Sequence, residues 1–146
     1  MIKSAVTKGK CRKLEDKRLY WLWLQKSFGF GAKIRELISY YGDAENLYKA
    51  GEASWRSSGF FGTGLFEIRP SKIENMKSTS LECGEIIIRG CEENGIEIVT
   101  PDSSFYPLNL KLIPDYPAVL FVRGDLSCLN EKLPIAVIGT RHPSEY

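Results

Sequence analysis

The chain has 146 residues, of which 43% are hydrophobic and 12% aromatic, so it can bury a core and does not have the composition of a disordered chain. Its longest apolar run, Leu19 to Leu24, is far shorter than the roughly eighteen residues that span a bilayer. The basic N-terminus is not followed by an apolar region and cleavage site, which argues against a secretory signal. We therefore expect a cytoplasmic protein.

The formal net charge is +2, but positive charge is concentrated at the N-terminus. Residues 1–18 carry seven lysines and arginines against Glu15 and Asp16, a net charge of +5, so the rest of the chain carries −3. A basic arm on a mildly acidic body can attract nucleic acid non-specifically. A solvated tail without a specific function is the alternative interpretation. We expect residues 1–17 to form a basic flexible tail.

The cysteine pattern predicts neither a metal site nor a redox site. The closest pair of cysteines is eight residues apart, and His142 is the one histidine of the chain. We expect reduced thiols that act as small buried apolar side chains, and we expect no cofactor. The four cysteines are Cys11, Cys83, Cys91 and Cys128.

The front of the chain predicts helices. After a mobile tail over residues 1–13, the stretch from Leu14 to Ser27 is apolar around most of a helix, which indicates a central position with several neighbours. A second helix, over 34–41, has apolar residues at positions i, i+3, i+4 and i+7, and Gly42 suits its C-terminal cap. That apolar face consists of Ile34, Leu37, Ile38 and Tyr41.

Two glycine-rich segments, 28–32 and 59–64, interrupt these helices. Each has the form apolar-Gly-apolar-Gly before a helix and resembles the turns of helix-hairpin-helix and SAM-like domains, whose backbone N–H groups can face a phosphate. A compact helical bundle with glycine turns is the equally open alternative. Between them we expect a short helix over 43–49, capped by Asp43, and a break at Gly51. Another short helix is expected near 65–69.

The polar run at 70–80 indicates a boundary. A capping box at Thr79 and Glu82 predicts the start of a helix that ends at Gly95, with residues 86–88 well buried.

The second half of the chain predicts strands that alternate with short helices. We expect strands at 96–100 and 118–122, and short helices near 106–112 and 126–130. The run 134–138 is apolar on both faces, as in a central strand of a parallel sheet. This order favours an α/β layer after an all-helical front, and therefore two domains.

The residues after this last strand are the most informative for function. In open α/β sheets, ligands bind at the carboxyl ends of strands. Gly139 lets the backbone approach an anion, Thr140 and Ser144 offer hydroxyls, and Arg141 offers a bidentate fork for a phosphate. The alternative is an ordinary strand-to-helix turn with a surface arginine.

Two long runs carry a family resemblance. They are YPLNLKLIPDYPAVLFVRG at 106–124 and IAVIGTRHPSEY at 135–146. Together they closely resemble the DNA-processing protein A (DprA/Smf) family in motif and spacing, and the helical front is similar to that family's SAM-like, helix-hairpin-helix domain. The resemblance implies a helical domain over 18–77 and, over 78–146, the beginning of an extended Rossmann-like domain that is truncated here, within the GTR loop.

The resemblance also implies a function. Members of this family bind single-stranded DNA with little sequence preference in natural transformation and recombination, protect it, load the RecA recombinase and form homodimers without catalysis. Arg141 matches the arginine of the family's phosphate-gripping loop, and Gly139, Thr140 and Ser144 match its neighbours. Since the rest of the Rossmann sheet is missing, we expect a fragment of this length to bind DNA poorly.

Two other functions stay open at this point. The first is a Rossmann-like nucleotide-binding hydrolase, although His142 as the one imidazole supports no catalytic triad or dyad. The second is a helical protein-interaction module, which the non-basic body of residues 18–77 favours over duplex binding. An exposed apolar patch on the helix that bears Ile34 and Tyr41 would support the module.

Overall fold

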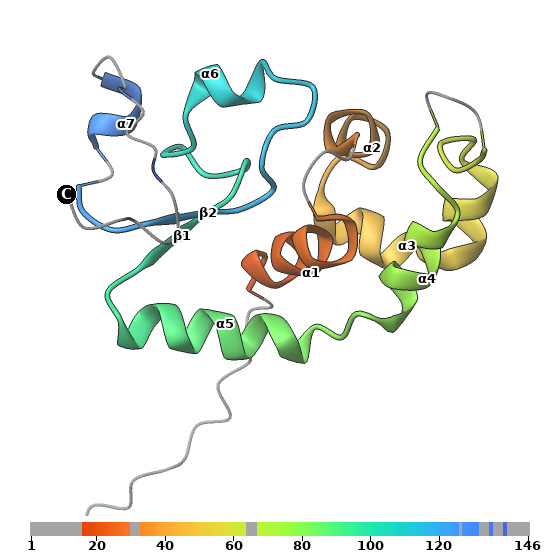
Figure 1. The fold of residues 1–146 in the computed structure, drawn as a ribbon, viewed down its shortest axis with the longest axis horizontal. Coiled ribbons are helices and arrows are strands. Elements are labelled where there is room, and N and C mark those ends of the chain that lie inside the picture. Colours follow the sequence, from red (N-terminus) through yellow and green to blue (C-terminus); the bar gives the residue numbers. More distant parts are fainter. Residues whose placement is uncertain are drawn as a thin grey trace, which may run out of the picture.

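The computed structural model describes residues 16–29, 33–63, 67–125 and 127–131, together with Ile135 and Gly139. The expected tail over 1–13 lies outside them. The described residues form seven helices and two short strands (Figure 1), and none of these helices is long and apolar enough to cross a membrane. The elements are α1 (Arg18–Phe28), α2 (Ile34–Tyr41), α3 (Ala44–Ser57), α4 (Ser71–Ser78), α5 (Glu82–Glu93), β1 (Glu97–Val99), α6 (Leu108–Lys111), β2 (Leu120–Val122) and α7 (Cys128–Glu131).

Helix α1 lies at the centre of the molecule, as its apolar sequence predicts (Figure 1). Helices α3, α4 and α5 all pack against it, and its side chains from Tyr20 to Leu24 are at most 3% exposed. A helix that is apolar around most of its circumference needs several neighbours. It begins at Arg18 rather than at Leu14, because the Asp16 carboxylate accepts a hydrogen bond from the Arg18 N–H at 3.0 Å.

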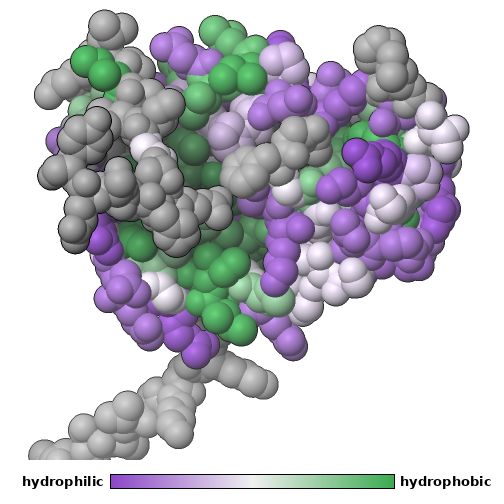
Figure 2. All heavy atoms as spheres, in the orientation of Figure 1, coloured by the Kyte–Doolittle hydropathy of each residue, from purple (hydrophilic) through white to green (hydrophobic). Residues whose placement is uncertain are grey.

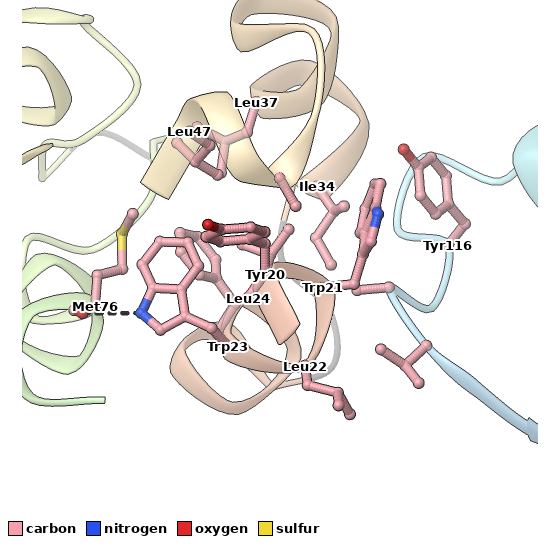
Figure 3. Close-up of a cluster of buried hydrophobic side chains, with 14 of the residues drawn as sticks. Tyr20, Trp21, Leu22, Trp23, Leu24, Ile34, Leu37, Leu47, Met76 and Tyr116 are labelled. Atoms are coloured by element: carbon pink, nitrogen blue, oxygen red, sulfur yellow. Dashed lines mark hydrogen bonds between the residues drawn. The ribbon is translucent and has the colours of Figure 1, made fainter. Parts of the chain in front are cut away.

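Trp23 connects α1 to two other helices (Figure 3). Its indole Nε1 donates a hydrogen bond to the Met76 carbonyl oxygen of α4 at 3.1 Å. Its ring centroid lies 5.0 Å from that of Tyr48 and 5.8 Å from that of Trp55, both on α3. Trp55 in turn donates from Nε1 to the Leu47 carbonyl oxygen at 2.7 Å. Both indole N–H groups are therefore satisfied inside the apolar core.

The predicted helix caps between α2 and α3 are confirmed. Gly42 has a φ of 92°, a positive value that glycine adopts without steric cost, and its N–H donates to the Ile38 carbonyl oxygen at 2.7 Å. The Asp43 side chain accepts a hydrogen bond from the Asn46 N–H at 2.7 Å. The sequence therefore determines where α2 ends and α3 begins.

Helix α3 is longer than predicted. The predicted break at Gly51 is confirmed, because its φ of 74° and ψ of 174° are not helical, but a second helical segment follows it and continues to Ser57. The second part buries Trp55, which is 4% exposed. Packing of this one large ring against α1 stabilises a turn that its local sequence does not indicate.

The helix predicted near 65–69 is wrong in its described part. Residues 67–69 are not helical, and Ile68 instead forms a β-bridge with Phe61. The Ile68 N–H donates to the Phe60 carbonyl oxygen at 2.8 Å, and the Gly62 N–H donates to the Ile68 carbonyl oxygen at 3.0 Å. Backbone pairing across the glycine turn thus replaces the expected helical hydrogen bonds, and residues 64–66 lie outside the described part.

The polar run at 70–80, interpreted as a boundary, contains helix α4. Ile73 and Met76, three residues apart, are each 1% exposed, and α4 packs against α1. Two apolar positions at helical spacing are enough for docking but give little periodic signal. The division at residue 77 stays a prediction; it falls within α4, and α1 packs against both α4 and α5.

Helix α5 begins without the capping box predicted at Thr79 and Glu82. Thr79 Oγ1 donates to the Asn75 carbonyl oxygen at the end of α4 at 2.7 Å. The Ser80 hydroxyl takes over the capping role and accepts a hydrogen bond from the Glu82 N–H at 3.1 Å. The predicted stop is confirmed, since Gly95 has a φ of 61°.

The burial predicted for residues 86–88 is wrong in part. Ile88 is 9% exposed and Ile87 is half-buried, but Ile86 is 69% exposed. Successive residues of a helix are turned by about 100°, so three in a row cannot all face one neighbour. Figure 2 shows hydrophobic residues gathered next to α5, whereas hydrophilic residues cover much of α3 and α4.

The two described strands are adjacent and antiparallel, not part of a parallel sheet. Glu97 pairs with Val122, and Val99 pairs with Leu120. The predicted central strand at 134–138 is described at Ile135 alone, which is 83% exposed and outside any strand. The described chain is therefore mostly helical with a small antiparallel sheet near its C-terminus, and this is compatible with a helical domain followed by the start of an α/β region.

Candidate nucleic-acid interface

Tyr106 ties together the loops on either side of α6. Its side chain is completely buried, and its hydroxyl donates a hydrogen bond to the Pro117 carbonyl oxygen at 2.6 Å. Its ring lies 6.2 Å from the ring of Tyr116, in a T-shaped arrangement. Burial raises the pKa of Tyr106 to about 12, so the phenol stays neutral and keeps donating. Both tyrosines of the two Tyr-Pro segments, Tyr106 and Tyr116, are therefore buried packing residues.

The Asn130 side chain of α7 forms hydrogen bonds with the backbone just before and at the start of α6. Its side-chain oxygen accepts a hydrogen bond from the Leu108 N–H at 2.9 Å, and its Nδ2 donates to the carbonyl oxygens of Ser104 and Tyr106, each at 3.2 Å. One amide thus fixes α7, the last described helix, to the N-terminus of α6. The sequence analysis missed this residue, because an isolated asparagine on a short helix has no motif around it.

The same loop packs against the central helix through Trp21 and Tyr116, which lie next to each other in Figure 3. A small cleft of about 220 Å³ opens beside them, between α1, α2 and the loop that precedes α6. The charged residues that line it are Asp43, Asp102 and Lys111. Since two carboxylates face one ammonium group, the cleft does not favour a polyanion.

The predicted phosphate loop is described at one residue. Gly139 is exposed, and no described atom lies within 4 Å of the position that a β-carbon would occupy there. Thr140, Arg141 and Ser144 lie outside the described residues. The assignment of this loop to phosphate binding therefore stays a prediction from the sequence.

The two glycine-rich segments meet in the structure. Phe28 at the end of α1 and Phe61 after α3 lie 6.3 Å apart, ring centroid to ring centroid. Lys72 Nζ donates to the Phe28 carbonyl oxygen at 2.6 Å, where the C-terminus of α1 carries a partial negative charge. This ammonium group therefore caps a helix.

The two described cations of the basic arm, Lys17 and Arg18, form ion pairs with carboxylates of the protein. Arg18 Nη2 pairs with Asp16 at 2.6 Å and with Glu92 of α5 at 3.3 Å, and Lys17 Nζ lies 3.9 Å from Asp43. The hydrogen bond from Arg18 lowers the pKa of Asp16. These two cations therefore connect α1 to its surroundings, and the other cations of the arm lie outside the described residues.

A second set of charges joins α3 to α4. Glu52 accepts hydrogen bonds from Arg56 at 2.7 Å and from Lys77 at 2.9 Å, and Arg56 also contacts Glu74 at 3.0 Å. Lys77 and Arg56 lower the pKa of Glu52. The network contains two cations and two carboxylates, so this surface is neutral and offers no excess charge to a phosphate backbone.

The predicted burial of the cysteines is confirmed for Cys91 and wrong for Cys83 and Cys128, which are half-buried. Cys83, Cys91 and Cys128 are free thiols, and Cys91 is 8% exposed. Within the described ranges, no group of three or more His, Cys, Asp or Glu side chains could hold a metal ion. Cys11 and His142 lie outside those ranges.

Comparison with known proteins identifies the C-terminal part of the chain. Residues 97–146 match the protein-family model described as DNA recombination-mediator protein A. The chain is 40% identical over 60 residues to a protein named DNA processing protein DprA from Bacillus subtilis (strain 168), which covers 41% of this chain and 20% of that protein. It is 40% identical over 55 residues to Protein Smf of Escherichia coli (strain K12), which covers 38% of this chain and 14% of that protein. The matched region thus spans a fifth or less of the length of these curated relatives.

Proposed function

We propose that this chain, whose C-terminal part matches the DprA/Smf family, binds single-stranded DNA and acts in DNA processing, natural transformation and recombination. The observation that carries the proposal is the family match over residues 97–146, since this segment includes the loop with Arg141. The name DNA recombination-mediator protein A supports a role at the step where a recombinase is loaded on a single strand.

The proposal has a structural part. Residues 18–77 would form a SAM-like, helix-hairpin-helix domain, and residues 78–146 would begin the family's extended Rossmann-like domain. The contact between the Phe28 ring at the end of α1 and the Phe61 ring after α3 supports the first assignment. The buried Tyr106, whose hydroxyl donates to the Pro117 carbonyl oxygen within the matched segment 97–146, supports the second.

The binding mechanism follows from the residue types of the loop. Arg141 would donate two parallel hydrogen bonds to one phosphate, with Thr140 and Ser144 as hydroxyl donors and Gly139 leaving room for the backbone. Such contacts recognise the DNA backbone and carry no sequence information. The protein would work without a cofactor or catalysis, as a cytoplasmic homodimer that passes the strand to a RecA-type recombinase.

The test is fluorescence anisotropy of a labelled oligo-dT strand with the 146-residue chain, titrated at several salt concentrations. We expect weak binding. The logarithm of the association constant should fall linearly with the logarithm of the salt concentration, with a slope of about −0.7 for each phosphate contacted. Arg141→Ala should weaken binding and make the slope shallower by about 0.7. Arg141→Lys keeps the charge but loses the bidentate fork, so it should restore the slope better than the affinity.

Arg69→Ala is the matched control. Arg69 is an exposed arginine of the loop before α4, and its loss changes the net charge by the same amount. If both variants weaken binding equally, net charge alone explains the interaction and Arg141 has no special role. If neither does, the DNA-binding site lies elsewhere in the chain.

A further inference from the structure

We propose that the Asn94–Gly95 junction is a site of spontaneous deamidation whose rate the fold restrains. The two residues lie between the end of α5 and the start of β1 (Figure 1), and both are exposed. Asparagine followed by glycine is a reactive sequence, because glycine has no side chain that blocks the approach of its own backbone nitrogen to the asparagine amide. The reaction needs water but no enzyme and no cofactor.

The reaction changes bonds at these two residues. The Gly95 backbone nitrogen loses its proton and attacks Cγ of Asn94, and Nδ2 takes up that proton and leaves as ammonia, so that a cyclic succinimide forms. Water then adds to one of the two ring carbonyls and opens the ring. Opening on one side gives aspartate, and opening on the other gives isoaspartate, in which the main chain runs through the former side chain. The net change is gain of water and loss of ammonia, without electron transfer.

The other asparagines of the chain are natural controls. The chain has five asparagines, and Asn94 is the one that glycine follows. The other four are also exposed, but leucine, methionine or glutamate follows each of them, and these side chains crowd the attacking nitrogen. They are Asn46, Asn75, Asn109 and Asn130. The neighbouring glycine, and not exposure alone, therefore distinguishes Asn94.

The native geometry keeps the two reacting groups apart. Asn94 Nδ2 donates a hydrogen bond to the Gly90 carbonyl oxygen at 2.7 Å, which directs the side-chain amide towards α5. The Gly95 N–H, whose proton must leave, donates to the Glu92 carbonyl oxygen at 3.3 Å. Both groups satisfy carbonyls that a helix C-terminus otherwise leaves without partners. Deamidation therefore requires the last turn of α5 to open.

Arg123 adds a third restraint. Its Nη2 donates to the Asn94 carbonyl oxygen at 2.8 Å, which ties the Asn94–Gly95 peptide group to the residue after β2. Ring formation requires rotation of the Asn94 ψ away from its native value of 9°, and this rotation breaks the contact. Backbone groups pair β1 with β2, so the pairing does not depend on the Arg123 side chain.

The products destabilise the end of α5. Aspartate at position 94 lacks the Nδ2 donor to Gly90 and adds negative charge at the helix C-terminus, where the macrodipole is already negative. Glu92 and Glu93 add two more carboxylates, and the last turn of α5, which is fully described, contains no basic residue. Isoaspartate also lengthens the main chain just before β1. Deamidation should therefore loosen the start of the segment that matches the family model, over residues 97–146.

The experiment is mass spectrometry of the 146-residue chain after incubation at mildly alkaline pH, both folded and in guanidinium chloride. The tryptic peptide 90–111 contains both Asn94 and Asn109, so fragmentation of one peptide measures the site and its control together. In the unfolded chain, conversion at Asn94 should be at least about tenfold faster than at Asn109, since glycine leaves the approach open. In the folded chain, conversion at Asn94 should be at least about tenfold slower than in the unfolded chain, since two hydrogen bonds must break first.

Arg123→Ala and Arg69→Ala separate this restraint from net charge. Each removes one exposed arginine, and Arg69 lies in the loop before α4. In the folded chain, Arg123→Ala should speed conversion at Asn94 by about twofold to tenfold, the weight of a single hydrogen bond, and Arg69→Ala should not. In guanidinium chloride both variants should react at the rate of the parent chain.

Each outcome decides the proposal. Equal conversion at Asn94 and Asn109 in the unfolded chain overturns the site, and equal rates in the folded and unfolded chain overturn the restraint. A rate that Arg123→Ala leaves unchanged contradicts the role of Arg123. Asn94→Asp, which copies one product, should speed amide hydrogen exchange at the end of α5 and in β1 more than Asn109→Asp does, and equal exchange contradicts the loosening. These measurements involve no DNA, so they do not depend on the proposed function.

Discussion

Replacing Tyr106 by phenylalanine removes one hydroxyl from the junction that holds the loops around α6. In the native structure this hydroxyl donates to the Pro117 carbonyl oxygen at 2.6 Å, and the ring that carries it is completely buried. The apolar contacts of the ring, including the T-shaped contact with Tyr116, are kept in the variant. The half-buried carbonyl loses its partner, so we expect the free energy of unfolding at neutral pH to fall by about 1 to 2 kcal/mol.

The same variant has a second, opposite effect at alkaline pH. An unfolded tyrosine ionises with a pKa of about 10, whereas burial raises the pKa of Tyr106 to about 12. Between these values the unfolded chain releases a proton that the folded chain keeps, so the native protein loses stability as the pH rises. A difference of about two pKa units corresponds to about 2.7 kcal/mol. Tyr106→Phe lacks this loss, so its deficit should shrink above pH 10 and then reverse.

Urea unfolding of both proteins at pH 7, 10 and 12 measures the two effects. Burial and then the charge of Tyr116 raise the pKa of Tyr106, so the difference between the two proteins includes the coupling of these two tyrosines, whereas the more distant titrating groups cancel. Tyr40→Phe is the control, because its ring is 62% exposed and its hydroxyl can reach water in either state. A constant stability difference between the parent and Tyr106→Phe from pH 7 to 12 would refute the account of a buried, neutral phenol.

Two further changes test how helices are fixed at their ends. Asp43→Ala removes the carboxylate that accepts from the Asn46 N–H at 2.7 Å, so the unfolding free energy in urea should fall by about 1 kcal/mol, while Asp43→Ser should recover most of it. An unchanged stability in the alanine variant would contradict the cap. Asn130→Ala removes three hydrogen bonds at the N-terminus of α6, so amide hydrogen exchange over α6 and α7 should speed up, and exchange in α1 should not. Equal acceleration in α1 would show that Asn130 supports the whole fold.

The helices could be predicted where the signal is local. Helix α2 shows this best, because its apolar spacing, Gly42 and Asp43 all lie within ten or so residues and act through short-range contacts. The central position of α1 follows from its composition for the same reason, since a helix without a polar side must be surrounded.

The two strands were predicted at their observed places, but helix α4 and the direction of strand pairing could not be predicted, because tertiary contacts decide them. The polar segment of α4 becomes helical since Ile73 and Met76 find a partner in α1, and the bridge at Ile68 depends on pairing with Phe61 across a turn. The direction of strand pairing is likewise a relation between two segments, and neither the sequence around Glu97 nor that around Val122 specifies it.

The residues of the candidate site also fall into those that the sequence predicts and those that it does not. The two long runs that match the family were visible in the sequence, because linear motifs need no partner elsewhere in the chain. The role of Asn130 and the exposure of Tyr40 were not visible in the sequence. Both depend on which distant residues pack or form hydrogen bonds near them in the folded chain.

The most direct test of the central claim is the anisotropy titration of labelled oligo-dT with the 146-residue chain, from low to physiological salt. The account predicts weak binding that falls with salt and that Arg141→Ala weakens more than Arg69→Ala. Binding that is independent of salt, or equal in the two variants, would contradict the assignment of Arg141 to the phosphate backbone.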